Sequence, residues 1–148
     1  MTRVTPALAP VTVTATLNAR LDRVGFTERR KIGLGHYVDA EEIARRRPIE
    51  LTDIIRSLPG FRIVEGEFGR TIEPTRTGRS QAENCVNVFI DHAMWDLSQP
   101  GELDRTMNVG EIAAVETYSG GYVPQEFSAP GTHCAVIVIW TKTKIDER

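Results

Sequence analysis

The chain has 148 residues, of which 41% are hydrophobic and 26% are charged, with a formal net charge of −2 and an isoelectric point near 5.9. This length and composition are typical of one globular domain that buries its own core. The slight acidity argues against non-specific binding to nucleic acid or to an anionic membrane, and no apolar run reaches the roughly 18 residues of a spanning helix.

The N-terminal region shows an extended tail followed by one strand pattern. Pro6 and Pro10 make residues 1–10 an expected extended tail, without the apolar core of a secretory signal. Residues 11–16, VTVTAT, alternate and are rich in β-branched residues, so they predict a strand. Residues 17–34 are irregular and charged, and the basic run at 29–31 is interpreted as a solvated face.

Two short helices follow. Asp39 with Glu42 forms a capping box, which predicts a helix that starts at Ala40 and ends before Pro48. In the next segment apolar residues recur at i, i+3, i+4 and i+7, a single apolar helix face that Pro59-Gly60 terminates. These apolar residues are Leu51, Ile54, Ile55 and Leu58.

The second half of the chain reads mainly as strands. Strands are expected at 61–64, 85–92, 114–118 and 135–143, with a loop at 94–106 and a capped helical turn at Asn108 to Glu111. Residues 65–84 are polar and rich in Gly, Arg and Thr, so they are expected to form a loop, or to contain a strand at 70–75. The last strand is apolar on both faces, so it should be central in the sheet. The pattern predicts an α+β fold, a small mixed β-sheet with short helices.

The two cysteines, Cys85 and Cys134, each open a strand that reads as central. If these strands are parallel neighbours, their starts lie at the same end of the sheet and the sulfurs can bridge, which implies an oxidising compartment. Two free, buried cysteines in a cytosolic protein are the alternative. The matched placement favours the disulfide.

Catalytic and metal sites have no recognisable motif. His36, His92 and His133 are far apart in the sequence, and no CxxC, HExxH, P-loop or GxSxG pattern occurs. A Cys-His hydrolase using Cys134 or Cys85 is the enzymatic alternative, but no positioned base is visible for it. We therefore predict a non-enzymatic protein with no catalytic residue, no metal and no cofactor.

The chain contains, in this order, the segments VTVTAT, VDAEEI, ELTDIIRSLPGFRIV, CVNVFIDH, VGEIAAVETYSGGYVPQEF and CAVIVIWTKTK. Together these segments resemble the plug domain of TonB-dependent outer-membrane receptors. The resemblance covers the chain from about Val11 to Lys142. It departs from the family where His92 replaces a glycine after Asp91, and in the turn before residue 85. The barrel that surrounds such a plug is absent from this chain, so we expect either a trimmed piece of a receptor or a plug without a barrel.

The resemblance implies a tail at 1–10, a plug-like domain at 11–143 and a tail at 144–148, located in the periplasm or outer membrane of a Gram-negative bacterium. It implies a module that occludes a barrel and contributes to ligand binding and gating. The expected partners are the C-terminal domain of TonB, a β-barrel domain or another periplasmic or outer-membrane protein, and an unidentified small molecule. The alternative is a free-standing periplasmic adaptor or sensor domain with the same fold and no pore.

The resemblance also assigns candidate residues. Residues 10–15 resemble a TonB box, which binds by strand addition, although the same residues are also expected to supply a strand of the domain. The arginines of the ligand-facing loops suit carboxylates or phosphates and the aromatics suit sugars or apolar groups. The TonB-box-like residues are Val11, Thr12, Val13, Thr14 and Ala15, and the ligand-facing candidates are Arg70, Arg76, Arg79, Trp95 and Tyr122.

Overall fold

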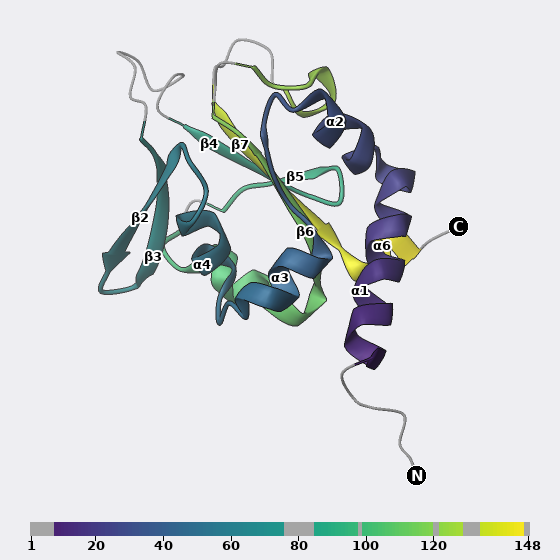
Figure 1. Cartoon of the computed structure of the whole chain (residues 1–148). Coiled ribbons are helices and arrows are strands. Elements are labelled where there is room, and N and C mark those ends of the chain that lie inside the picture. Colours follow the sequence, from purple (N-terminus) through teal and green to yellow (C-terminus); the bar gives the residue numbers. More distant parts are fainter. Residues whose placement is uncertain (1–7, 76–84, 98, 120–121, 129–133, 147–148) are drawn as a thin grey trace.

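The computed structural model describes residues 8–75, 85–97, 99–119, 122–128 and 134–146, with side chains from Thr14 onward (Figure 1). A five-stranded mixed sheet of order β1-β6-β7-β4-β5 forms its centre, and β2 and β3 form a separate hairpin. The strands are β1 (His36–Val38), β2 (Phe61–Gly66), β3 (Gly69–Pro74), β4 (Val86–Ile90), β5 (Ala93–Trp95), β6 (Ile112–Tyr118) and β7 (Ala135–Thr141). The helices are α1 (Leu8–Arg20), α2 (Phe26–Ile32), α3 (Ala40–Arg46), α4 (Leu51–Arg56), α5 (Glu102–Thr106) and α6 (Lys142–Asp146), with 3-10 turns η1 (Leu21–Val24), η2 (Val109–Glu111) and η3 (Gln125–Phe127).

The expected α+β architecture with a small mixed sheet is confirmed. β7 is central, paired with β4 in parallel and with β6 antiparallel. Its side chains from Ala135 to Trp140 are all buried, as the two-faced apolar pattern predicts. One face of the sheet packs against α3, α4 and the β2–β3 hairpin, and the other against α1, α2, η3 and α6.

The parallel pairing of β4 and β7 brings the two cysteines to the same end of the sheet. Cys85 and Cys134 stand immediately before the two strands and are joined as a disulfide, with their Cα atoms 4.6 Å apart. Both cysteines of the chain are therefore oxidised, and the expected bridge is confirmed. It ties the starts of two central strands that are 49 residues apart in sequence.

The two short central helices also form as predicted. The Asp39 carboxylate accepts a hydrogen bond from the backbone N–H of Glu42 at 2.9 Å, so Asp39 is the N-cap of α3, which starts at Ala40 as predicted. The Glu42 carboxylate pairs with Arg46 rather than completing the expected capping box. α4 buries Leu51, Ile54 and Ile55, and the chain then turns at Gly60, whose φ is +96°.

The strand expected at residues 11–16 is wrong, because these residues lie within helix α1. Leu17 and Leu21 follow them four residues apart and are both buried, and the side-chain oxygen of Asn18 accepts a hydrogen bond from Ala40 N–H at 2.9 Å. Packing of α1 against α3 therefore overrides the β propensity of the Val-Thr alternation.

Three further expectations change. Residues 17–34 are not irregular but continue through η1 into α2, and the expected loop at 94–106 contains strand β5 and helix α5. The last strand ends at Thr141, where α6 begins and buries Ile145. Residue 10 lies within α1 and residue 144 within α6.

Candidate functional site

A carboxylate lies inside the central sheet. Glu116 stands in the middle of β6, where its side chain has no exposed surface. Four donors reach its two oxygens: Tyr118 Oη and Trp140 Nε1 at 2.6 Å each, and Arg29 Nε and Nη2 at 2.7 and 2.8 Å. Because a buried charge is costly without partners, this complete set of donors is what allows Glu116 to remain there.

Arg29 lies in α2 and is 87 residues away from Glu116 in the sequence. Its side chain is 14% exposed, and its remaining nitrogen bonds reach Glu126 Oε1 at 2.7 Å and the Val24 carbonyl at 2.9 Å. The guanidinium lies 5.1 Å from the ring centre of Phe127, which favours a cation–π contact. The sequence interpretation of residues 29–31 as a solvated face is therefore wrong for Arg29.

Protonation in this cluster is set by burial and by Glu116. Burial, followed by the adjacent Glu116 charge, raises the pKa of Tyr118 well above its usual range. Burial would lower the pKa of Arg29, but its bonds to Glu116 and the nearby Glu126 raise it overall. Tyr118 therefore remains a neutral donor and Arg29 a cation at all physiological pH values.

The exposed rim of this cluster is the turn between β4 and β5. Asp91 and His92 both have positive φ, +52° and +74°, which is the conformation of a two-residue hairpin turn that asparagine and glycine favour. Asp91 accepts hydrogen bonds from the N–H and hydroxyl of Thr141 at 2.8 and 2.6 Å. The His92 ring stacks on Phe127, and its Nε2 lies 3.5 Å from Glu126.

Together these contacts fasten α2, η3 and the β4–β5 turn to one face of the sheet. The Glu116 carboxylate is saturated with donors and closed to solvent, so it is unsuited to act as a general acid or base toward a substrate. Sequence reasoning missed Arg29, Glu116 and Trp140 as a unit. The available signal was a glutamate within a strand whose other residues are largely apolar, because such a glutamate requires a cationic partner.

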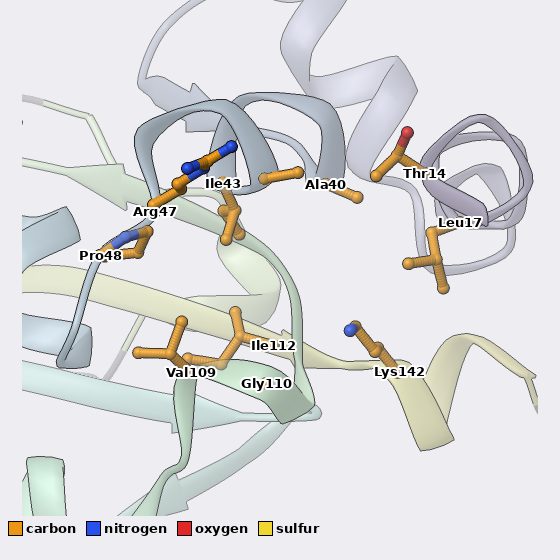
Figure 2. A pocket seen from close by; sticks show the side chains of 11 residues that line it. Thr14, Leu17, Ala40, Ile43, Arg47, Pro48, Val109, Gly110, Ile112 and Lys142 are labelled. Carbon is orange, nitrogen blue, oxygen red and sulfur yellow. The ribbon is translucent and has the colours of Figure 1, made fainter. Parts of the chain in front are cut away.

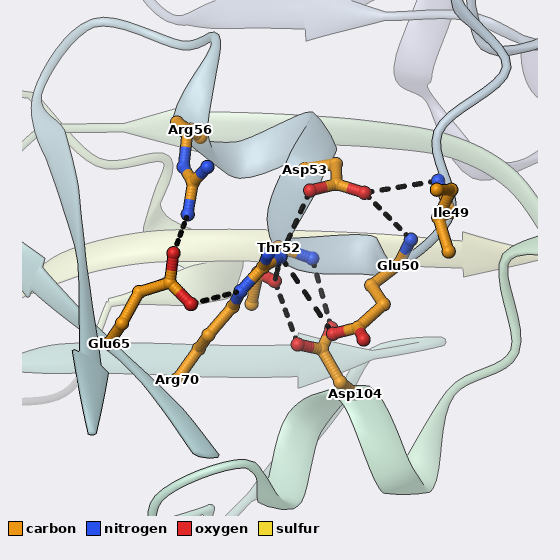
Figure 3. A network of polar contacts seen from close by, with 8 residues as sticks. All are labelled: Ile49, Glu50, Thr52, Asp53, Arg56, Glu65, Arg70 and Asp104. Carbon is orange, nitrogen blue, oxygen red and sulfur yellow. Dashed lines mark hydrogen bonds and ion pairs between the residues drawn. The ribbon is translucent and has the colours of Figure 1, made fainter. Parts of the chain in front are cut away.

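A second polar cluster surrounds Arg70, the first of the ligand-facing candidates (Figure 3). Arg70 Nη1 donates to Asp53 at 2.9 Å and to the Thr52 hydroxyl at 3.0 Å, and its Nε donates to Glu65 at 3.4 Å. Thr52 in turn donates from its N–H and hydroxyl to Asp104 at 3.0 and 2.7 Å. This network joins the β2–β3 hairpin to α4 and α5.

The charges in this cluster perturb one another. Backbone N–H groups of Glu50 and Ile49, together with Arg70, lower the pKa of Asp53. The adjacent Asp104 carboxylate raises the pKa of Glu50. An open hollow of about 440 Å³ lies beside the cluster, and both acidic and arginine side chains line it. Since Arg70 is already bonded to its own domain, a ligand would have to compete with these acids for it.

The structure separates the other ligand-facing candidates. Trp95 lies on edge strand β5 opposite Val88, and the residue is 45% exposed. Residues directly opposite each other share a face, so Trp95 lies on the same side as Val88 and Arg70, both of which line one hollow. Tyr122 is 47% exposed and contacts Tyr118 on the other face. Arg76 and Arg79 lie outside the described residues.

The remaining candidate residues lie in α1, at the disulfide and outside the described residues. Residues 11–15 belong to α1, as described above. The disulfide removes the thiolate that a Cys-His hydrolase would need from Cys85 or Cys134. His133 lies outside the described residues, and within the described ranges no group of three or more His, Cys, Asp or Glu side chains is arranged to hold a metal ion.

None of the described helices is both long and apolar enough to cross a membrane. No protein-family model matches the chain, and no curated protein sequence matches it. Solved structures do. A variant of the ferric enterobactin receptor PfeA from Pseudomonas aeruginosa aligns over 80% of this chain at 20% identity, with a TM-score of 0.53. The siderophore receptor PirA from Acinetobacter baumannii aligns over 74% at 16% identity, also with a TM-score of 0.53.

The chain spans less than a fifth of these receptors, 18% of the PfeA chain and 17% of the PirA chain. At this level of identity the likeness establishes the fold, which is that of a receptor plug domain. The fold expected from the ordered sequence motifs is thereby confirmed.

Proposed function

We propose that this chain is a non-enzymatic plug-like module of a TonB-dependent outer-membrane receptor. In this role it occludes a β-barrel and contributes to ligand binding and gating. The observation that carries the proposal is the plug fold itself, which extends over most of the chain. The structures that share this fold are named as receptors, and a receptor function requires no catalytic residue.

The proposed location is the periplasm or outer membrane of a Gram-negative bacterium. The Cys85–Cys134 disulfide supports this location, because such bonds form in the periplasm and are rare in the cytosol. The disulfide links the starts of β4 and β7, so it would hold the centre of the sheet together while other parts of the module move.

The proposed ligand is an iron chelate, the class that the names of PfeA and PirA give for those receptors. Trp95 and Tyr122 offer exposed aromatic surface on opposite faces, and Arg70 offers a cation held by Asp53 and Glu65. Arg76 and Arg79 complete the proposed set. The TonB C-terminal domain is the proposed partner of residues 11–15, and strand addition to TonB would require α1 to unwind there.

The experiment that tests this proposal is an immunoblot of fractionated cells with an antibody against this domain. A heat-modifiable band in the outer-membrane fraction, several times larger than 16.5 kDa, is the expected result. A soluble periplasmic band near 16.5 kDa would overturn the receptor proposal.

A free-standing periplasmic interaction domain is the second candidate, and one observation favours it. Both faces of the central strands are already covered by helices and the hairpin, and the side chains of β6 are all buried. A core that is complete in this way does not depend on a surrounding barrel for its stability. The soluble periplasmic band is the outcome that would select this candidate.

A further inference from the structure

An apolar groove lies at the end of the sheet opposite the disulfide. Helices α1 and α3 form one side of it, and η2 with the start of β6 and the start of α6 form the other (Figure 2). Its volume is about 220 Å³. Its apolar walls come from Leu17, Ala40, Ile43, Ala44, Val109 and Ile112.

Two cations flank this groove, and none of its described lining residues is acidic. Arg47 stands at the α3 end and Lys142 at the α6 end, on either side of the apolar walls (Figure 2). Within the described part of the chain, neither side chain takes part in a hydrogen bond or an ion pair. By contrast, the neighbouring Arg46 pairs with Glu42 on its own helix. The charges at Arg47 and Lys142 are thus left available to an outside group.

The backbone at Arg47 gives independent support. Arg47 closes α3 with φ +50° and ψ +54°, a left-handed conformation that glycine adopts at helix ends with the least strain. An arginine in this conformation is a backbone outlier, and such outliers cluster at functional positions. Glycine would end the helix with less strain, so the arginine at this position favours a role for its side chain beside the groove.

We propose that this groove docks a short segment of a partner protein in which one apolar side chain is flanked by carboxylates. The groove volume of about 220 Å³ is below the range of about 300–1,000 Å³ that encloses whole small molecules, and it suits a single large side chain. The apolar walls receive that side chain, and Arg47 and Lys142 pair with acids on either side of it. The inference does not depend on the receptor proposal, because it requires neither a barrel nor TonB.

The test uses the ¹⁵N-labelled chain with its disulfide intact and a capped heptapeptide that has one central phenylalanine between two pairs of glutamates. Saturable chemical-shift changes at Ile43, Ala44, Val109 and Gly110 are the expected result. A peptide with serine in place of phenylalanine, and one with lysines in place of glutamates, should each bind more weakly. Absence of saturable shifts at millimolar peptide, or shifts confined to other surfaces, would overturn the proposal.

Variants then separate the groove from the general surface charge. Arg47→Gly combined with Lys142→Gln should weaken peptide binding about five- to tenfold, the effect of removing two exposed ion pairs. Ala44→Trp should abolish the groove shifts, because the exposed Ala44 side chain lines the groove and a larger one would fill it. Lys31→Gln is the matched control, since Lys31 is exposed on α2 away from the groove, and it should bind as the unaltered chain does. Unchanged peptide binding by Ala44→Trp would overturn the proposal. A membrane surface would replace the protein partner if anionic phosphatidylglycerol vesicles changed the chemical shifts of the groove residues and the peptide did not.

Discussion

Replacing Arg29 with methionine should destabilise the fold by about 3 kcal/mol, because it leaves the buried Glu116 carboxylate without its cationic partner. The substitution removes two of the four donors to Glu116 and keeps only Tyr118 and Trp140. Breaking a buried ion pair from one side costs about 3–5 kcal/mol. The low end applies because the Arg29 side chain is 14% exposed, which lets water reach the site from which it is removed.

The measurement is urea unfolding at neutral pH, in oxidising buffer, with the same slope required for each variant. The expected loss corresponds to a fall of about 10 °C in Tm for a chain of this size. Arg30→Met is the matched control. Arg30 neighbours Arg29 but pairs with Asp39 at the surface, so its loss should cost about 1 kcal/mol or less.

A second variant distinguishes the buried charge from lost packing. Adding Glu116→Gln to Arg29→Met removes the uncompensated charge and keeps an amide that can pair with Tyr118 and Trp140. The double variant should therefore be more stable than Arg29→Met alone. The reasoning is refuted if Arg29→Met costs no more than Arg30→Met, or if Glu116→Gln adds its own loss on top of it.

Three further predictions concern the same scaffold. Since the pKa of Tyr118 is raised in the folded state, the unfolded chain releases this proton at lower pH, and the free energy of unfolding should fall above pH ~10 by up to about 1.4 kcal/mol per pH unit. In urea unfolding of Tyr118→Phe at the same pH values, this part of the fall should be missing. Replacing Cys85 and Cys134 with serine should cost about 4 kcal/mol in the chain-entropy model, measured by the same unfolding, and thiol labelling of the denatured, unreduced protein should find no free thiol. Binding of the TonB C-terminal domain, measured by calorimetry, should disappear when the residues before Thr16 are deleted, and unchanged binding after the deletion would remove this role from residues 11–15. Ala15→Gly should strengthen the binding up to about fivefold, because glycine makes α1 easier to unwind.

The parts of the fold that the sequence predicts well are those with local signals. The Asp39 N-cap and the apolar face from Leu51 to Leu58 predict α3 and α4, because caps and periodicity act within a few residues. The apolar run at 135–140 predicts a central strand because no exposed strand would be apolar on both faces. The two cysteines predict a bridge on the condition that their strands are parallel neighbours, and both the parallel pairing of β4 with β7 and the disulfide are present.

The errors occur where distant residues decide the local structure. The β-branched alternation at 11–16 favours a strand on its own, but the helical conformation of α1 and η1 allows Leu17 and Leu21 to pack together in the core. A local window cannot weigh that contact, because the residues that supply it are absent from the window. For the same reason the sequence does not predict the ion pairs of Arg70, because its acidic partners Asp53 and Glu65 come from two other elements.

Arg29 shows how part of this limit can be overcome. The run at 29–31 is basic and looks solvated when considered alone, whereas Glu116 lies in a stretch that must be buried because the strand beside it is central. A buried carboxylate requires a cation, and α2, which packs on the face of the sheet that Trp140 shares, can supply one. A sequence interpretation that starts from the buried acid and searches for its partner would thus find the ion pair of Arg29 with Glu116, whereas one that starts from the basic run does not.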